Sequence, residues 1–567
     1  MKKILLAQLN SSVGDFENNK NKALSALEKA QKEDIYLVIF PELFLSGANF
    51  GDLFNRFPKI IKAQDEALNE IIKNVKNSAL VGFVKEENGK YYNSVAFVQN
   101  QKLIKTFEKS ILENKAEKLE ARTFEAKKIN ADERIIKLNN KKIGIIFENE
   151  NIEFNGIDYL VVFDYSITRG NKEYFKHQKL SKIAREKNIK LIYINQTGAN
   201  DEYIYEGASR AYNEQGEICA LARMFDEELL VLDGFMGQIT PILEGLHEKP
   251  AENFDLNYEN DLSRTYHALI YSIKNYFKKH GLKRAVLGLS GGLDSTICAT
   301  ILADALGANN VLGISMPSKL TSNESKNDAK ELAQNLGINF IEIPIKETYD
   351  LTLNNLNHIF DEIELEKYSQ TFTKDNIQAR SRATILWCVS NEYSSMIPIA
   401  TSDKSELYMG YATTNGDMTG GYAPIMDVCK TKLFALARWM NKNREIKNAI
   451  PENIILKPPG AELALDPKTG KTLIAEDALM PYEFLDEVIW RIENLHQSTN
   501  DMMKETFLYE KKNNITNTQK LEWLNKFFKR MNSAAFKLYI TPLAPMIDNS
   551  SINKRDYHMP ITSKIIY

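Results

Sequence analysis

Short apolar runs and amphipathic stretches alternate along the first half of the chain. Apolar runs of strand length lie at residues 3–9, 36–40, 78–83, 92–99, 134–138, 142–147, 159–163 and 191–196. Helix-length amphipathic stretches lie at 18–33, 62–77 and 173–186, and residues 208–232 predict a closing hairpin. Mixed strands and helices with packed apolar runs predict a layered α/β architecture.

The periodicity changes over residues 236–262, where Pro241, Gly245, Pro250 and acidic side chains interrupt it. We interpret residues 1–238 as one domain, 239–261 as a linker and 262–567 as a second domain. The second domain reads as helix 262–280, strand 284–289, helix 294–306, strand 311–315, helix 324–336 and strand 339–343. Such strand–helix–strand repeats predict a parallel sheet with right-handed crossovers.

Composition narrows the possible classes of protein. The 567 residues include 72 Lys and Arg against 75 Asp and Glu, and the net charge of −3 argues against a generally basic nucleic-acid-binding protein. The apolar runs are far shorter than the ~20 residues of a membrane-spanning helix, and no signal-peptide core is visible. The four cysteines form no Cys-x-x-Cys pair and fit a reducing cytoplasm, and none precedes Cys219.

The most specific motif is a glycine-rich string that leaves a predicted strand and opens a helix. It reads Gly288-Leu289-Ser290-Gly291-Gly292-Leu293-Asp294-Ser295. Glycines let the backbone approach an anion closely, and a helix N-terminus offers unpaired N–H groups. Asp294 would repel a bare phosphate, which suggests a bridging Mg²⁺. The string is neither a Walker loop nor a dinucleotide motif. It matches the pyrophosphate loop of enzymes that cleave ATP between its α and β phosphates.

Further strings follow in a fixed order. They are Asn376–Arg382 (NIQARSR), Thr401–Leu407 (TSDKSEL), Gly416–Gly421 (GDMTGG), Lys430-Thr431 and Lys457–Leu463 (KPPGAEL). The ordered set resembles the NAD+ synthetases, in particular the large glutamine-dependent kind. This resemblance covers essentially the whole chain.

The resemblance implies a nitrilase-like α-β-β-α sandwich followed by a doubly wound parallel-sheet domain of the adenine nucleotide α-hydrolase type. It implies ATP-dependent amidation of deamido-NAD+ through an adenylated intermediate. By residue, it implies ATP on Gly288–Ser295 with Thr401 and Lys430, Mg²⁺ on Asp294 and Glu406, and deamido-NAD+ on Asn376, Arg382, Glu406, Asp417 and Lys529. Catalysis would rest on Asp294, Glu406 and Lys430. Gly460 departs from the family, which usually has a small hydroxyl residue there.

The first half resembles an amidase that lacks its nucleophile. Glu42 in Phe40-Pro41-Glu42-Leu43 matches the general base of the nitrilase fold, and Lys109 matches its lysine. The nucleophilic cysteine belongs at the fourth position of Gly144-Ile145-Ile146-Phe147, where Phe147 has no nucleophilic atom. Lys115 replaces a tyrosine of the glutamine pocket. We therefore hypothesise that this half no longer hydrolyses glutamine and that ammonia comes from solution or from a separate donor.

Other interpretations remain open. One is a full glutamine-dependent enzyme with an unrecognised nucleophile; another is a non-catalytic nucleotide-binding relic. A third is a different amide-forming ATP pyrophosphatase, such as a relative of GMP or asparagine synthetases. The sequence also leaves nicotinate mononucleotide open as the acid substrate. The resemblance suggests a homo-oligomer, a dimer or higher, with no nucleic-acid or membrane partner.

Overall fold

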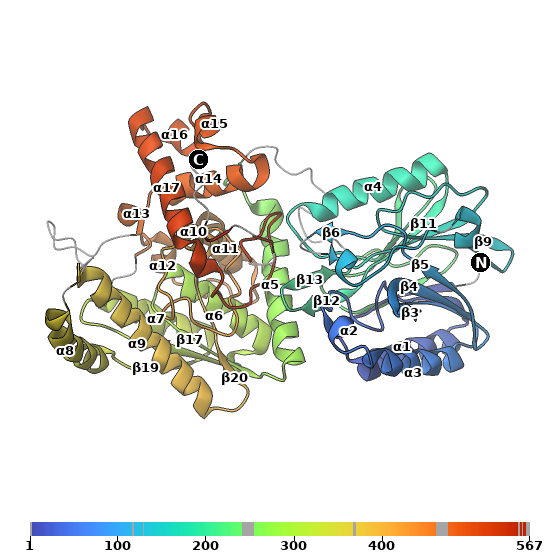
Figure 1. Cartoon of the computed structure of the whole chain (residues 1–567), viewed down its shortest axis with the longest axis horizontal. Helices are drawn as coiled ribbons and strands as arrows, with labels where there is room; N and C mark the ends of the chain where they lie inside the picture. The colour runs from blue at the N-terminus through green and yellow to red at the C-terminus, as the bar shows by residue number, and fades with distance from the viewer. Residues whose placement is uncertain are drawn as a thin grey trace. The chain divides into compact units, whose positions relative to one another are not determined.

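The computed structural model describes residues 3–115, 118–128, 130–240, 254–363, 365–366, 370–460, 475–553, 556–557 and 560–562. The chain forms two compact units, Met1–Lys249 and Pro250–Tyr567, which Figure 1 colours blue to green and green to red. Residues 241–253, which make up much of the predicted linker, lie outside the described part. Within the described ranges no helix has the length and apolar character needed to cross a bilayer.

Two six-stranded sheets form the centre of the first unit. The first has the order β16 (Glu228–Leu232), β1 (Lys3–Gln8), β2 (Ile35–Ile39), β3 (Ser78–Glu87), β4 (Lys90–Gln99) and β5 (Lys102–Glu108). The second has the order β15 (Ile218–Leu221), β14 (Arg210–Tyr212), β11 (Lys190–Ile194), β10 (Tyr159–Phe163), β9 (Lys141–Phe147) and β8 (Ile135–Leu138).

Alternation along the strands explains how the two sheets are covered. In β9, Ile143, Ile145 and Phe147 join the core shared by both sheets, whereas Ile146 packs in the cluster under α4 (Lys172–Lys187). Helices α1 (Phe16–Lys32) and α3 (Ile60–Asn74) cover the first sheet on its other side (Figure 1). The predicted α-β-β-α sandwich is confirmed.

The first unit also holds several short elements. They are α2 (Leu53–Arg56), the pair β6 (Asn114–Lys115) and β7 (Lys118–Leu119), the pair β12 (Thr197–Asn200) and β13 (Tyr203–Glu206), and 3-10 turns at Glu120–Arg122 and Ala131–Arg134.

The hairpin predicted over residues 208–232 is only partly right. Strands β14 and β15 pair with each other, but β16 leaves them and pairs antiparallel with β1 in the other sheet, with Leu5 opposite Val231. The predicted helix 62–77 also ends early, at Asn74, because Val75 adopts an extended conformation. Pairing between strands far apart in sequence follows from the packing of the whole unit, which local pattern does not encode.

A four-stranded parallel sheet organises the second unit. Its order is β19 (Asn339–Glu342), β18 (Val311–Ser315), β17 (Arg284–Gly288) and β20 (Met396–Pro398). The chain starts at β17, adds β18 and β19 on one side, and returns to place β20 on the other. The predicted doubly wound sheet is therefore confirmed. In such sheets, ligands bind beyond the carboxyl ends of the strands where the winding reverses, here between β17 and β20.

Helices flank this sheet and build a separate cap. Helix α5 begins at Glu259, inside the range interpreted as a linker. Helix α9 packs through Leu386 on the sheet face that carries Val286 and Ile314. Helices α10, α14 and α17 share a further core. The helices are α5 (Glu259–Lys279), α6 (Leu293–Leu306), α7 (Asn323–Leu336), α8 (Lys346–Glu362), α9 (Gln370–Glu392), α10 (Lys404–Tyr408), α11 (Lys430–Asn443), α12 (Glu452–Leu456), α13 (Ala475–Ala478), α14 (Tyr482–Leu495), α15 (Thr499–Met502), α16 (Leu508–Lys512) and α17 (Asn517–Leu538), with a 3-10 turn at Ala308–Asn310.

Candidate active site

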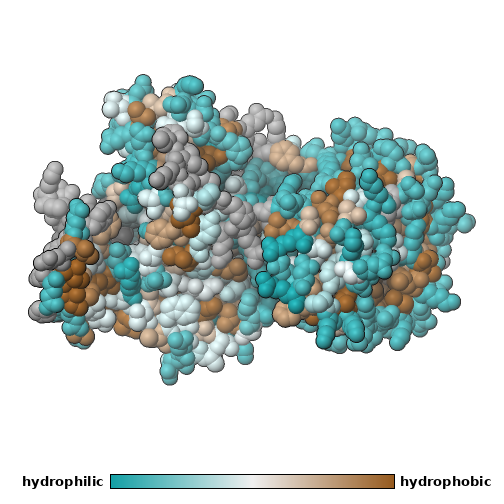
Figure 2. Space-filling view, in the orientation of Figure 1, coloured by the Kyte–Doolittle hydropathy of each residue, from teal (hydrophilic) through white to brown (hydrophobic). Residues whose placement is uncertain are grey.

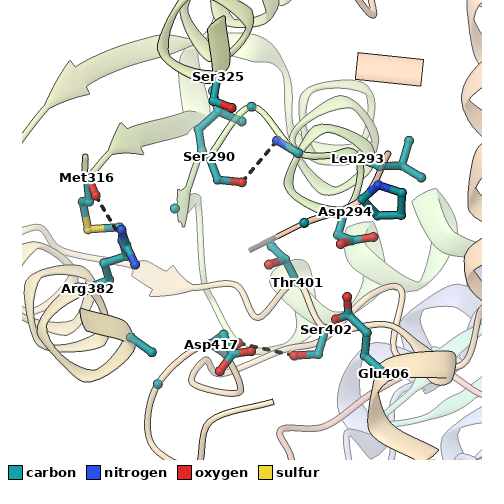
Figure 3. A pocket seen from close by; sticks show the side chains of 18 of the residues that line it. Ser290, Leu293, Asp294, Met316, Ser325, Arg382, Thr401, Ser402, Glu406 and Asp417 are labelled. Carbon is teal, nitrogen blue, oxygen red and sulfur yellow. Dashed lines mark hydrogen bonds between the residues drawn. The ribbon is translucent and has the colours of Figure 1, made fainter. Parts of the chain in front are cut away.

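A cavity in the second unit lies at the carboxyl ends of β17, β18 and β20, and includes the point between β17 and β20 where the winding of the sheet reverses. Its walls come from the loop after β17, the end of β18, helix α9, the segment after β20 and the start of α11 (Figure 3). Those lining residues include Gly288, Leu289, Ser290, Gly291, Gly292, Leu293, Asp294, Met316, Arg382, Thr401, Glu406, Asp417, Lys430 and Lys457. The fold thus gathers residues from several separate segments of sequence around one space.

The glycine-rich loop is shaped for close approach by an anion. Gly291 has φ +78°, and a Cβ there would lie 2.2 Å from the carbonyl oxygen of Ser325, so only glycine fits. The Ser290 hydroxyl accepts a hydrogen bond from the Gly292 N–H at 3.2 Å and holds the turn. Helix α6 begins directly after Gly292 without a side-chain cap, and Gly292, Leu293 and Asp294 at this helix start line the cavity. A helix N-terminus of this kind favours phosphate.

Three carboxylates and one ammonium meet beside this loop. Lys430 Nζ lies 2.7 Å from Asp294 Oδ1, 2.6 Å from Asp403 Oδ2 and 3.1 Å from Glu406 Oε1. Asp403 also caps α10, since its Oδ1 accepts the Glu406 N–H at 2.9 Å. One carboxylate oxygen from each of the three acids lies within 4.8 Å of the corresponding oxygens of the other two. A single ammonium group therefore faces three acids.

Burial and mutual charge set the protonation of this group. Burial raises the pKa of Asp403 to about 7, despite Lys430, and raises the pKa of Glu406 as well. Burial alone would lower the pKa of Lys430, but Asp294, Asp403 and Glu406 outweigh it and raise that pKa. Three acidic side chains thus surround one ammonium, and their oxygens are the kind of donor that Mg²⁺ prefers. The residues present therefore fit the magnesium ion that the sequence predicts.

Most of the predicted site residues lie around this cavity, but three do not line it. Ser295 is buried behind the loop and its hydroxyl contacts Ser290 at 3.2 Å. Asn376 sits on α9, where its Oδ1 accepts a hydrogen bond from Thr413, a lining residue, at 2.8 Å. Lys529 is exposed on α17, outside the lining. The end of the Lys457–Leu463 string, residues 461–463, lies outside the described residues.

Sequence reasoning missed two residues of the site. Asp403 stands three positions before Glu406, and this Asp-x-x-Glu spacing is a helix-capping signal that could have drawn attention to it. Lys457 lines the cavity, and its Nζ contacts the Ser325 hydroxyl at 2.5 Å. Lys457 opens the Lys457–Leu463 string, which was singled out in the sequence but without a role for this lysine.

The first unit brings together the predicted amidase residues. Lys109 Nζ lies 3.0 Å from Glu42 Oε1 and 2.9 Å from Glu120 Oε1, with all three side chains buried. Asn93 donates to Glu42 at 2.6 Å, and the Tyr165 hydroxyl donates to Glu120 at 2.9 Å. Gly82 allows the Glu42 turn to approach, because a Cβ there would lie 2.1 Å from the Pro41 carbonyl oxygen.

Phe147 closes this group of residues. It ends β9, has 0% exposure, and its ring centroid lies 5.7 Å from Lys109 Nζ and 5.5 Å from the Arg134 guanidinium. A cation over an aromatic face is an attractive contact. Cys219, the first cysteine of the chain, is buried on β15, and burial raises the pKa of its thiol. An aromatic ring thus stands beside the Glu42–Lys109 pair, and burial disfavours the thiolate form of Cys219.

The buried Glu42 predicts a pH-dependent stability. Burial raises the pKa of Glu42 from an ordinary 4.5 to about 8, against the pull of Lys109 and Lys118. Between these values the folded chain holds a proton that the unfolded chain has lost, so the free energy of unfolding falls as pH rises. The side chain at position 42 of Glu42→Gln cannot titrate, so the free energy of unfolding of this variant should fall less steeply with pH. The slopes of the parent and the variant should differ by up to about 1.4 kcal/mol per pH unit. Urea unfolding at pH 6, 7 and 8 measures both slopes.

The control for this comparison is Glu66→Gln, which removes an exposed carboxyl group from α3 of the same unit. It should keep the slope of the parent protein. Parallel slopes for Glu42→Gln and the parent would contradict a raised pKa at Glu42.

Two family models together match nearly the whole described chain. The model described as carbon-nitrogen hydrolase matches residues 3–240, and the model described as NAD synthase matches residues 265–531. Each match coincides with one of the two compact units. The cavity described above lies within the second match.

Relatives and solved structures match over most or all of the chain. The chain is 32% identical to the glutamine-dependent NAD(+) synthetase of Aquifex aeolicus over 100% of both chains, and 32% identical to that of Thermotoga maritima over 86% and 88%. The glutamine-dependent NAD+ synthetase of Acinetobacter baumannii, solved with ADP, has 26% identity and a TM-score of 0.70 over 99% and 98%. That of Cytophaga hutchinsonii, with 21% identity, shares the fold with a TM-score of 0.82 over 99% and 98%.

Proposed function

The chain belongs to the glutamine-dependent NAD+ synthetase family and is an NAD+ synthase, and within that family we propose that it takes its nitrogen from free ammonia. In this proposal it joins ammonia to deamido-NAD+ at the expense of ATP, with AMP and pyrophosphate as by-products. The observation that carries the proposal is Phe147, a buried ring beside Glu42 and Lys109 where covalent amide hydrolysis needs a nucleophile.

The surroundings of Phe147 also support loss of the glutaminase. Glu42 and Glu120 both contact the Lys109 ammonium, so that lysine is already engaged by two acidic side chains. The ring of Phe147 belongs to the core between the two sheets and fills space that a substrate amide would need. Lys115, in place of a tyrosine, is exposed with its ammonium 3.9 Å from Glu113. Several positions therefore depart together from what a glutaminase requires.

For the synthetase reaction, we assign the binding of the ATP phosphates to the Gly288–Ser295 loop and the start of α6. The N–H groups there and the Ser290 hydroxyl offer donors to phosphate oxygens. The carboxylate of deamido-NAD+ attacks the α-phosphate of ATP and pyrophosphate leaves. Ammonia then attacks the acyl-adenylate and AMP leaves. Lys430, held between Asp294 and Glu406, is placed to neutralise charge that develops on the leaving pyrophosphate.

The substrate acid would lie on the side of the cavity formed by Arg382 and Asp417. Arg382 reaches from α9 and donates to the Met316 carbonyl oxygen at 3.0 Å, which fixes its guanidinium at the wall. The Asp417 carboxylate accepts the Thr413 N–H at 2.5 Å, and burial raises its pKa. Asn376 supports this wall through Thr413, so we assign it an indirect role. Lys529 is exposed on α17, and a bound dinucleotide would need to extend that far to contact it.

We assign magnesium binding to Asp294 and Glu406, with Asp403 beside them. When bound, Mg²⁺ supplies positive charge that stabilises the transferring phosphate group. The chain contributes the acids and holds them at a fixed spacing through α6 and α10.

We also propose that the protein is a homo-oligomer. Large apolar side chains are exposed on and after α8 and along α9, and Figure 2 shows apolar residues gathered at the left edge of the view. They are Leu351, Ile359, Ile363, Leu365, Phe372 and Trp387. Several exposed large apolar side chains in one region are typical of an interaction site.

The choice of nitrogen donor is tested with the purified full chain, deamido-NAD+, ATP and Mg²⁺. Ammonium should yield NAD+, whereas ammonia-free glutamine should yield less than about one hundredth as much, because no nucleophile opens the amide. Equal yields would overturn the loss of the glutaminase. A Cys219→Ser variant then asks whether that buried thiol is responsible. No NAD+ from either donor would overturn the assigned reaction.

A further inference from the structure

A buried carboxylate outside the cavity links the two helices that carry Lys430 and Glu406. Asp486 lies in α14, is 1% exposed, and does not line the cavity. One of its oxygens contacts α10 and the other contacts α11. Nothing in its sequence surroundings, Phe484-Leu485-Asp486-Glu487, sets it apart from an ordinary helix carboxylate.

The contacts of Asp486 end at residues adjacent to the site. Its Oδ1 accepts the Ser405 hydroxyl at 2.5 Å, and Ser405 directly precedes Glu406. Its Oδ2 accepts both the N–H of Thr431, at 2.9 Å, and the Thr431 hydroxyl, at 2.7 Å. Thr431 directly follows Lys430. The Ser405 oxygen in turn accepts the Lys430 N–H at 2.8 Å, so one carboxylate closes a network around both positions.

The chemistry of a helix start explains why a carboxylate stands here. Helix α11 begins at Lys430, and its N-cap residue, Cys429, provides no side-chain cap. The unpaired N–H groups of Lys430 and Thr431 are instead taken by Ser405 and Asp486. Tyr258 adds a further bond, because its hydroxyl lies 2.8 Å from the Thr431 hydroxyl. A negative charge at a helix N-terminus is favourable, so Asp486 stabilises the start of α11.

We propose that Asp486 is a positioning residue for the synthetase reaction, which sets the Lys430 ammonium and the Glu406 carboxylate at their working distance. It touches neither substrate nor Asp294. It acts by tying the first turn of α11 to α10, and the inference rests on the proposed roles of Lys430 and Glu406. A shift of about 1 Å in a positioned group can cost on the order of 100-fold in rate.

The test replaces Asp486 by asparagine in the full chain. Asn keeps one acceptor oxygen for Thr431 but presents an NH₂ group to Ser405, which loosens the link to α10. We expect kcat with ammonium to fall roughly 10- to 100-fold. The KM values for ATP and deamido-NAD+ should stay within about threefold, because Asp486 lies outside the lining of the cavity. The split between kcat and KM is measured by steady-state kinetics.

The matched control is Glu487→Gln, the next residue of the same helix. Glu487 is 2% exposed and accepts hydrogen bonds from Arg491 at 2.7 Å and from the Leu508 N–H at 2.6 Å, away from Lys430 and Glu406. The Glu487→Gln variant should unfold at a lower temperature than the parent protein and keep the parent kcat. An equal loss of kcat in both variants, at an equal loss of unfolding temperature, would overturn the positioning role.

A double-mutant cycle separates this inference from the proposed function. If Asp486 acts through Lys430, then Asp486→Asn should lower kcat by less than about threefold in a Lys430→Met background. Fully additive losses would overturn the positioning role while leaving the role of Lys430 intact. A Lys430→Met variant with full kcat would instead overturn the assigned role of Lys430. Should Asp486→Asn fail to fold, Ser405→Ala removes the same link and should show the same loss of kcat.

Discussion

Replacing Lys430 by methionine should lower kcat for NAD+ synthesis from ammonium by about 10²- to 10³-fold. Methionine keeps an unbranched apolar chain but removes the ammonium that faces Asp294, Asp403 and Glu406. The negative charge on the leaving pyrophosphate then loses its partner, and three acids lose theirs. Steady-state rates at saturating ATP, deamido-NAD+ and ammonium measure the effect, with thermal unfolding as a check that the variant is folded.

The control is Lys432→Met, two residues farther along the same helix. Lys432 is also buried and pairs with two acids, Asp261 and Asp548, but does not line the cavity. It should lower stability and leave kcat within about threefold. A Lys430→Met variant that keeps kcat within that range would contradict the assigned role, as would an equal loss of rate in Lys432→Met.

The local sequence pattern was sufficient to predict those functional features that lie within one continuous segment of the chain. The predicted strands 159–163 and 311–315 match β10 and β18, and the glycine-rich loop lies between β17 and α6 as expected. Such segments can be predicted locally, because strands, turns and helix N-termini each have a characteristic sequence pattern. The position of Phe147 at the end of β9 could be read in the same way.

Features that depend on distant contacts could not be read from the sequence. The pairing of β16 with β1 joins the two ends of the first unit. Asp486 lies in the middle of an amphipathic helix, and only the packing of α14 against α10 and α11 gives it partners. The grouping of Lys430 with three acids likewise joins residues from three segments of the chain. The sequence motifs identified Lys430 as a candidate site residue, but only the fold gives the distances on which its chemistry depends.

Replacing Lys109 by methionine should destabilise the first unit by about 3–5 kcal/mol. The variant leaves Glu42 and Glu120 buried without the cation that lies within 3.0 Å of each. For a unit of this size the loss corresponds to a fall in unfolding temperature of about 10 °C. Scanning calorimetry of the full chain measures it, and the transition of the second unit is recognised by its rise on addition of ATP and Mg²⁺.

This prediction distinguishes a structural lysine from a catalytic one. The control Lys141→Met breaks a 2.6 Å ion pair with Asp158 in the same unit. Both partners are more than 30% exposed, so the loss of stability in this control should stay below about 1 kcal/mol.

Adding Glu120→Gln to Lys109→Met should recover part of the stability lost in Lys109→Met, since one uncompensated charge is then removed. Below the unfolding temperature, NAD+ synthesis from ammonium should continue at the parent rate. A variant with unchanged stability that loses NAD+ synthesis from glutamine, while the parent protein shows it, would mean that Lys109 still serves an amidase reaction and is not only the partner of two buried acids.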